Sequence, residues 1–279
     1  HLNEVLNGLP EGVTVLAGPP SLGKTTLAKQ IADHVAATEK VPVMFWTFEQ
    51  SKEDLRIKSL ARLASIDSRK ILKGRTDPDT WGKVEKAAET YRSGSGQWLT
   101  VIEGSRTDSV ETIRTAALMA KHKAGGDKPV FLVLDYLQIL PTPADVRVDG
   151  IKDKVDFNLS ELRRLARDLK SPVLVISSEN REAYKEGKTR PSLVALKESG
   201  GIEYSADAVL CLWRDPAESD RLSADFKRKT VRVEARVLKN RNGELASINL
   251  DFTPAWAVFT SAGQVEALSW SDALGNGQA

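Results

Sequence analysis

The segment that most constrains the fold is Gly18–Thr25, which reads GPPSLGKT and matches the pattern G-x-x-x-x-G-K-[ST]. It follows a short apolar run, Gly12–Ala17, and precedes a helical pattern over residues 24–37 with apolar residues every four positions. Between a strand and a helix, such a loop points its backbone amides at phosphate groups, and the helix dipole adds positive potential. The sequence therefore predicts a nucleotide site, in which Lys24 reaches the β- and γ-phosphates and the Thr25 hydroxyl ligates Mg²⁺.

Two acidic residues stand where predicted strands end. Asp135 follows the apolar run Pro129–Leu134, and an acid there, beside the phosphate loop, is the expected second partner of Mg²⁺. Glu49 ends the run that starts at Val41 and could deprotonate the attacking water. It could equally be an acid favoured by the dipole of the helix that follows, and the residues alone leave these two interpretations even. The residues expected to bind the nucleotide are Gly18, Pro19, Ser21, Leu22, Gly23, Lys24, Thr25, Thr26 and Asp135.

Short apolar runs alternate with helical patterns along most of the chain. After the first strand and helix, strands are expected at Val41–Phe48, Trp98–Ile102, Pro129–Leu134, Pro172–Ile176 and Ala208–Trp213. Helices are expected at 52–64, from Asp77 or Asp79 to Arg92, from an Asp108 cap to Lys121, and at 151–170. This alternation predicts an α/β fold with a mostly parallel sheet covered by helices.

The C-terminal part changes character. The segments Val231–Leu238, Leu245–Phe252 and Trp256–Phe259 have the pattern of antiparallel strands, and the Asn-Gly pair at 242–243 is a strong hairpin signal. We expect one domain over residues 1–262, with this β extension at its end. Residues 263–279 are expected to form a weakly structured tail.

Composition excludes several classes of protein. Forty Lys and Arg against thirty-eight Asp and Glu leave a net charge of +2, so any anion site must be local rather than part of a basic coat. No run approaches the roughly 18 apolar residues of a membrane span. The single cysteine, Cys211, excludes a disulfide within the chain and a thiolate zinc cluster, and favours a reducing, cytoplasmic setting.

Several segments together resemble the ATPase domain of DnaB-type replicative helicases, which has a RecA-like fold. They are Phe48–Ser51 (FEQS), Leu134–Gln138 (LDYLQ), Glu198–Glu203 (ESGGIE), Ala206–Asp207 (AD) and Lys239–Gly243 (KNRNG). The resemblance covers nearly the whole chain, from Gly12 to about Phe259. It implies an enzyme that hydrolyses Mg-ATP at subunit interfaces of a hexameric ring and thereby moves along single-stranded DNA in replication.

The resemblance also assigns roles to individual residues. Glu49 would activate water, and Lys239 with Arg241 would reach the γ-phosphate in the neighbouring subunit; from the residues alone these two cations could simply be solvated. Lys197, Glu198 and Gly200 match a central-channel loop that grips the backbone of single-stranded DNA. That loop could otherwise be an ordinary helix entry.

The chain departs from the family pattern in three places. Ser178 stands where the family has a glutamine thought to sense the γ-phosphate, which puts the coupling of hydrolysis to the DNA loops in doubt. Ala195–Lys197 replaces an Asp-Leu-Arg segment and loses the guanidinium fork. The N-terminal collar domain is absent, and the chain begins at His1, so we expect an upstream collar or primase domain in the whole protein.

Two other functions remain open from the sequence. One is a ring- or filament-forming ATPase of the RecA or KaiC kind, acting in recombination or regulation without unwinding. The other is a nucleotide-gated DNA-binding or loading module with weak hydrolysis.

Overall fold

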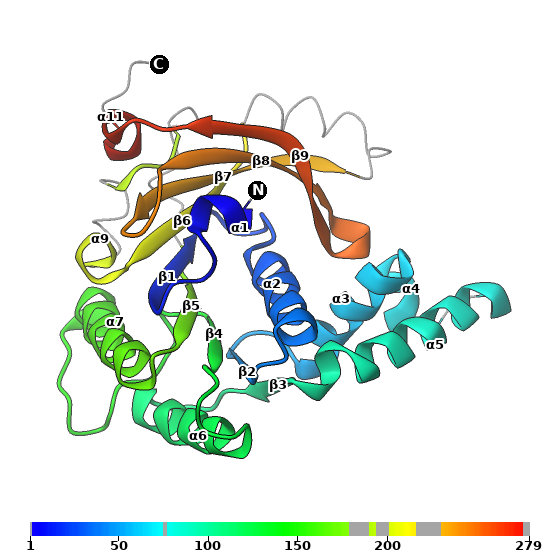
Figure 1. Cartoon of the computed structure of the whole chain (residues 1–279), viewed down its shortest axis with the longest axis horizontal. Helices are drawn as coiled ribbons and strands as arrows, with labels where there is room; N and C mark the ends of the chain where they lie inside the picture. The colour runs from blue at the N-terminus through cyan, green and yellow to red at the C-terminus, as the bar shows by residue number, and fades with distance from the viewer. Residues whose placement is uncertain (1, 75–76, 179–189, 194–200, 216–229, 276–279) are drawn as a thin grey trace.

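The computed structural model describes residues 2–74, 77–178, 190–193, 201–215 and 230–275 (Figure 1). The strands of these residues form one sheet in the order β3-β2-β4-β5-β1-β6-β7-β8-β9. Their bounds are β1 Gly12–Ala17, β2 Val43–Thr47, β3 Leu99–Glu103, β4 Phe131–Asp135, β5 Pro172–Ile176, β6 Ala208–Trp213, β7 Val231–Asn240, β8 Ala246–Thr253 and β9 Val258–Ala267.

The first six strands pair in parallel and the last three antiparallel, which confirms the expected fold class. The helices are α1 Leu2–Leu6, α2 Lys24–Thr38, α3 Lys52–Ala64, α4 Ser68–Leu72, α5 Pro78–Ser93, α6 Val110–Lys123, α7 Gly150–Leu169, α9 Ile202–Ser205 and α11 Trp270–Leu274, with short 3₁₀ turns η1 Ser95–Gln97 and η3 Pro254–Trp256. Within the described ranges, no helix is both long and apolar enough to cross a membrane.

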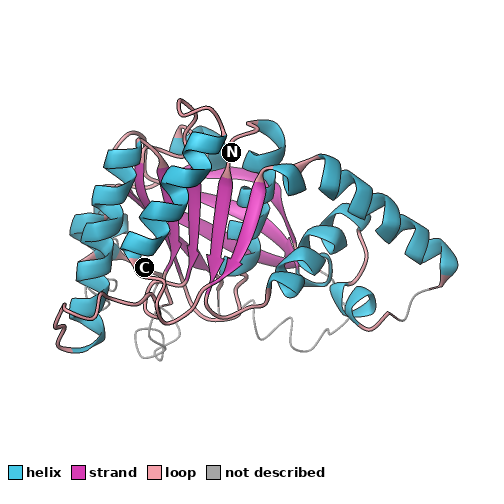
Figure 2. Ribbon diagram, turned by 90° about the horizontal axis from the view of Figure 1, so that it is seen from below, coloured by secondary structure: helices cyan, strands magenta, loops and turns pink. Residues whose placement is uncertain are grey.

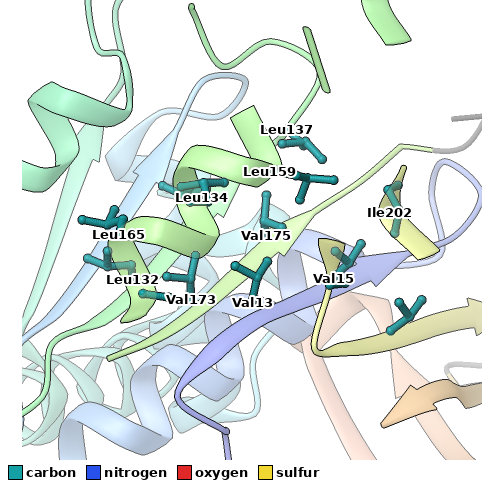
Figure 3. Packing of buried hydrophobic residues seen from close by; sticks show 14 of the residues in the cluster. Val13, Val15, Leu132, Leu134, Leu137, Leu159, Leu165, Val173, Val175 and Ile202 are labelled. Atoms are coloured by element: carbon teal, nitrogen blue, oxygen red, sulfur yellow. The ribbon is translucent and has the colours of Figure 1, made fainter. Parts of the chain in front are cut away.

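Helices cover both faces of the sheet (Figures 1 and 2), as a parallel sheet requires. Successive strand residues point to opposite faces, so Val15 and Leu16 of β1 enter different cores. One core joins the strands to α6 and α7; Figure 3 shows Val13 and Val173 of the sheet lying against this helix layer, with Leu159 on α7. The other core packs the sheet against α2 and Leu55 of α3.

The C-terminal end differs from expectation. β9 continues to Ala267, pairing there with Ala246 of β8, and α11 follows with a capping box at Ser269. Ala273 of α11 is fully buried. The expectation of a weakly structured tail was therefore wrong for residues 263–275, because strand pairing and a short helix that buries Ala273 order them.

Two smaller outcomes concern turns. The Asn-Gly pair lies between β7 and β8, as the hairpin signal indicated. Helix α6 begins after Ser109 rather than Asp108; the Asp108 carboxylate instead accepts a hydrogen bond from the Ser105 backbone N–H.

The buried face of α7 gives a stability prediction. Leu159 is fully buried, whereas Leu118 on α6 is 51% exposed. Leu159→Ala should lower the free energy of unfolding by about 2–5 kcal/mol, because it removes packed methyl groups and leaves a cavity. Leu118→Ala should change it by less than about 0.5 kcal/mol. Urea denaturation of both variants checks this; equal effects would show that Leu159 does not pack in the core.

Candidate active site

The phosphate loop lies between β1 and α2, and its backbone can be built only with glycine at two positions. Gly18 and Gly23 have φ of 140° and 87°. A Cβ on Gly18 would lie 2.6 Å from the Leu212 carbonyl oxygen, and one on Gly23 would lie 2.9 Å from Cζ of Phe259. The loop is thus held from two sides, by β6 and by β9.

The contact with Phe259 packs the β8–β9 hairpin against the phosphate loop. The rings of Phe252 on β8 and Phe259 on β9 stack with centroids 4.2 Å apart, directly behind Gly23. Sequence reasoning saw these strands only as an extension of the sheet. Nothing in the local pattern could show that the chain returns to the phosphate loop more than 200 residues later.

Lys24 is folded across the loop. Its Nζ donates hydrogen bonds to the Gly18 carbonyl oxygen at 2.6 Å and to that of Pro19 at 2.9 Å, and the residue is 9% exposed. The ammonium therefore already lies against the concave side of the loop. Phosphate oxygens of a bound nucleotide could there replace the two carbonyl oxygens as its hydrogen-bond acceptors. The predicted contacts of Pro19, Ser21, Leu22 and Thr26 with a nucleotide stay predictions.

Asp135 and Thr25 lie together, as predicted. Asp135 is the last residue of β4 and is 1% exposed, and its carboxylate accepts a hydrogen bond from the Thr25 side chain at the start of α2. Burial raises the pKa of Asp135 to about 6, although the hydrogen bond from Thr25 acts in the opposite direction. Among the described residues, its Oδ2 atom is buried without a hydrogen-bond partner.

This pair fits a magnesium ion held partly by phosphate. The part of the chain described contains no group of three His, Cys, Asp or Glu side chains able to hold a metal alone. Mg²⁺ in nucleotide sites needs only one or two protein oxygens, with phosphates and waters completing its shell. The Thr25 hydroxyl and the unsatisfied Asp135 oxygen would supply them.

Strand register brings Glu49 to the same edge of the sheet. Thr47, the last residue of β2, pairs with Asp135 of β4, and the Phe48 backbone N–H donates to the Asp135 carbonyl oxygen at 2.7 Å. Glu49 follows in a turn held by the Thr47 hydroxyl, which donates to the Gln50 carbonyl oxygen at 2.8 Å. Its side chain is exposed, so it can meet water from solvent next to the phosphate loop.

Sequence reasoning missed one cation, Lys58. Burial lowers the pKa of Lys58, and the negative charges of Asp135, Asp54 and Glu49 partly offset that effect. Its Nζ also donates a hydrogen bond to Oε1 of Gln50. Lys58 and Asp54 are four residues apart on α3, a spacing normally attributed to a surface ion pair, so the pattern gave no sign that this lysine faces the site.

Lys239 and Arg241 do not join this cluster. Arg241 forms an ion pair with Asp207 at 2.9 Å, and Lys239 Nζ donates to the Glu203 carbonyl oxygen at 2.6 Å. Asp207 in turn accepts from the backbone N–H of Val13 at the start of β1, whereas the phosphate loop follows the end of β1. At about 3.3 Å per residue, the strand separates the two places by roughly 17 Å.

Comparison with known proteins identifies the family. The model of the DnaB-like helicase C-terminal domain matches residues 1–261. The chain belongs to this family. Replicative DNA helicase DnaB of Haemophilus influenzae is 29% identical over 255 residues, or 90% of this chain and 51% of that protein; DnaB of Buchnera aphidicola is 27% identical over 260 residues, or 92% and 53%. The chain thus spans about half the length of these curated relatives.

Solved structures confirm the RecA-like fold of this DnaB-like domain. One solved ATPase domain superposes with a TM-score of 0.80 and 24% identity, covering 93% of this chain and 88% of that one. A DnaB-like replicative helicase studied with primase gives the same score and identity over 93% and 59%. A KaiC-like protein of Pyrococcus horikoshii has a TM-score of 0.55 at 16% identity, over 93% and 94%. The resemblance drawn from the residues is confirmed.

One departure from the DnaB pattern, Ser178, lies within the described residues, whereas Ala195–Lys197 lies outside them. Ser178 follows β5, and its backbone is held by Gln138, whose Nε2 donates to the Ser178 carbonyl oxygen at 2.9 Å and whose Oε1 accepts from the Ser178 N–H at 3.2 Å. The predicted DNA-contacting residues Lys197, Glu198 and Gly200 lie outside the described residues.

The buried acid of this DnaB-like domain makes a prediction about pH. Because the folded-state pKa of Asp135 lies near 6 and above its ordinary value, its protonated form stabilises the fold below about pH 4, and that stability is lost as the pH rises through 6. Asp135→Asn should therefore raise the free energy of unfolding at pH 7, without nucleotide or Mg²⁺, by up to about 3 kcal/mol.

Denaturant unfolding of the parent and of Asp135→Asn at pH 4 and pH 7 tests this. The gap between the two proteins should be small at pH 4 and open by pH 7. A gap that is constant with pH would show that Asp135 ionises in the folded protein as it does in the unfolded chain.

Proposed function

We propose that this chain is the Mg-ATP-hydrolysing motor domain of a ring-forming replicative DNA helicase. The observation that carries the proposal is the division of the machinery between two edges of one sheet. Lys24, Thr25, Asp135 and Glu49 gather at one edge, and the cations expected to complete the site lie at the other. A complete site therefore needs a second copy of the chain.

Each gathered residue has a task in phosphoryl transfer to water. The loop amides and Lys24 bind the phosphates, while Thr25 and Asp135 would hold Mg²⁺. The ion supplies charge neutralisation on the phosphate oxygens. Glu49 orients a water molecule and accepts its proton as the water oxygen bonds to the γ-phosphorus. The bond between the γ-phosphorus and the oxygen that leaves with ADP breaks in the same reaction.

Lys58 assists by charge. Glu49 must approach a polyanion, and a half-buried ammonium next to Glu49 and Asp135 lowers the repulsion between the carboxylates and the phosphates. Its bond to Gln50 ties this charge to the turn that carries Glu49.

Lys239 and Arg241 would act in the neighbouring subunit. Arg241 is about half exposed and lies next to the Asn-Gly turn after β7, a place from which it can extend. Moving its guanidinium from Asp207 to a neighbour's γ-phosphate would stabilise transition-state charge and make hydrolysis depend on assembly. Support for a ring, which we expect to be hexameric, comes from this separation and from family membership.

The track would be single-stranded DNA, contacted by Lys197, Glu198 and Gly200. One lysine and backbone amides per subunit, repeated round a ring, suit phosphate spacing without reading bases, and this fits a chain of net charge +2. Relatives about twice as long, and one structure described with primase, support an upstream collar or primase partner. The single buried Cys211 suits a cytoplasmic replication role.

Glu49→Gln tests the chemistry. It should lower kcat for ATP hydrolysis by about 10²- to 10⁴-fold, because the amide cannot accept the proton of water, while nucleotide binding is retained. Unwinding of a forked duplex should be lost in parallel. The control is Glu53→Gln, four residues further on the exposed start of α3, which should hydrolyse and unwind at the parent rate.

Undiminished hydrolysis by Glu49→Gln would remove Glu49 from its assigned role. Vigorous ATP turnover by the parent without any unwinding would instead favour a KaiC-like ATPase or a loading module.

Mixing two inactive variants tests whether the finger acts between subunits. Lys24→Ala and Arg241→Ala should each lose about 10³-fold or more in ATP turnover. Mixed at equal amounts and allowed to exchange, roughly a quarter of the interfaces pair an intact phosphate loop with an intact Arg241, so turnover should return to roughly that fraction. No recovery on mixing would argue for action within one chain. Arg232→Ala, which breaks a comparably exposed ion pair with Asp251 on the neighbouring strand, should leave turnover unchanged.

A further inference from the structure

A group of buried charges joins α2 to α3 away from the predicted nucleotide contacts. It consists of Lys29 and Asp33 on α2 and Ser59 and Arg62 on α3, and we name it the α2–α3 charge network. Lys29 and Ser59 are 0% exposed and Asp33 is 7% exposed. Nothing in the nucleotide chemistry described above uses these side chains.

Hydrogen bonds and an ion pair connect all four members of the network. Lys29 Nζ donates to Asp33 Oδ1 at 2.6 Å and to Ser59 Oγ at 2.5 Å. The Ser59 hydroxyl donates to Asp33 Oδ2 at 2.6 Å, and Arg62 Nη2 forms an ion pair with the same oxygen. Three groups from two helices therefore converge on one carboxylate.

Its outer members reach two more elements. Arg62 Nη1 contacts the Ala257 carbonyl oxygen, between β8 and β9, at 3.5 Å. Lys29 Nζ lies 5.5 Å from the ring centroid of Tyr91 on α5. The network thus lies where the phosphate-loop helix, α3, α5 and the C-terminal hairpin meet.

Stability alone does not explain such a network. Removing an ammonium and a carboxylate from water costs several kcal/mol each, and well-packed apolar residues of similar volume often hold two helices as firmly. Hydrogen bonds to a buried carboxylate add directionality, since they allow only one rotation and one height of α3 against α2. The network is therefore suited to setting geometry.

The geometry it sets belongs to the active site. Lys24 and Thr25 occupy the first turn of α2, just over one turn before Lys29. Lys58 is the immediate neighbour of Ser59, and Glu49 lies three residues before the start of α3. We propose that the α2–α3 charge network is a positioning device that holds Lys58 and Glu49 in register with the phosphate loop. This inference rests on the proposed function, since its role is exerted on ATP hydrolysis.

The titration of Lys29 allows the effect of the network on ATP hydrolysis to be measured as a function of pH. The charged groups that face it are Asp33 on its own helix and Arg56 and Arg62 on α3. The ring of the titratable Tyr91 on α5 also faces it. Burial lowers the pKa of Lys29 to about 8, with Asp33 opposing that shift. Its charge is therefore lost within the range in which ATPase rates can be measured.

The first experiment removes all the charges together, so that none is left buried without a partner. The triple variant Lys29→Met, Asp33→Leu, Arg62→Met should keep the thermal stability of the parent within a few degrees. It should lose about 10- to 100-fold in kcat, because small misplacement of catalytic groups is costly, while KM for ATP changes by less than about twofold. The control is Asp168→Asn, which breaks the 2.7 Å Arg114–Asp168 pair between α6 and α7 and should leave kcat unchanged.

The second experiment compares pH profiles of kcat for the parent and for Lys29→Met, in which Asp33 keeps Arg62 and Ser59. The parent should lose several-fold in kcat as the pH rises through about 8, and this limb should be missing from Lys29→Met. Asp135 and Lys58 titrate in both proteins and cancel in the comparison. If the triple variant does not fold, the difference between these profiles decides the question.

The outcomes separate the two proposals. Parent-like kcat in a folded triple variant, or coincident pH profiles, would overturn the positioning role and leave the proposed function intact. A parent that hydrolyses no ATP, with or without single-stranded DNA, would overturn the proposed function, and the positioning role would fall with it.

Discussion

The parallel register of the central strands is the constraint on which the rest of the structure depends. Parallel strands end at one edge, so residues far apart in the chain meet there once their strands pair. The pairing of Thr47 with Asp135 places the ends of β2 and β4 together, and β5 links them to β1, which leads into the phosphate loop. A slip of one residue would turn each strand's side chains to the opposite face and scatter the site.

At that edge of the sheet, partial removal from water opposes the ionisation of the charged side chains. Burial favours the neutral form of Asp135, whereas its proposed role as a magnesium ligand requires the ionised form. The half-buried Lys58 is affected in the opposite sense, since partial burial favours its uncharged amine and lowers its pKa. Each group makes the other's charge easier to hold, and a bound cation between phosphates and Asp135 would complete the balance. Shifted pKa values of this kind are typical of functional sites, here one suited to a charged ligand.

Much of the fold and part of the candidate site could be predicted from local sequence patterns, and the limit of that prediction has a physical cause. The phosphate loop and Asp135 could be predicted because strand, loop and helix succeed one another within a few residues, and because a buried strand has a continuous apolar sequence. Phe259 behind Gly23 and Lys58 beside Glu49 could not, since each depends on how distant elements pack. Lys29 reads as an ordinary lysine on an amphipathic helix until α3 covers it. The antiparallel pairing that extends β9 is likewise a tertiary effect.

The same register that gathers the phosphate-loop residues and Asp135 at one edge places Lys239 and Arg241, the cations of the proposed inter-subunit contact, at the other. β7 runs antiparallel to β6, so its end returns to the edge at which β1 begins, and Lys239 and Arg241 are carried there. Side-chain rotation cannot span a strand of roughly 17 Å, because an arginine side chain is much shorter than that. If Lys239 and Arg241 complete the site as proposed, its closure within one chain would require the sheet to break. In the proposed ring, two copies placed edge to edge would achieve it without distortion, and repetition of such a contact with a closing rotation would complete the ring. A ring would in turn give every subunit one complete site, and the proposed hydrolysis would then be a property of the assembly.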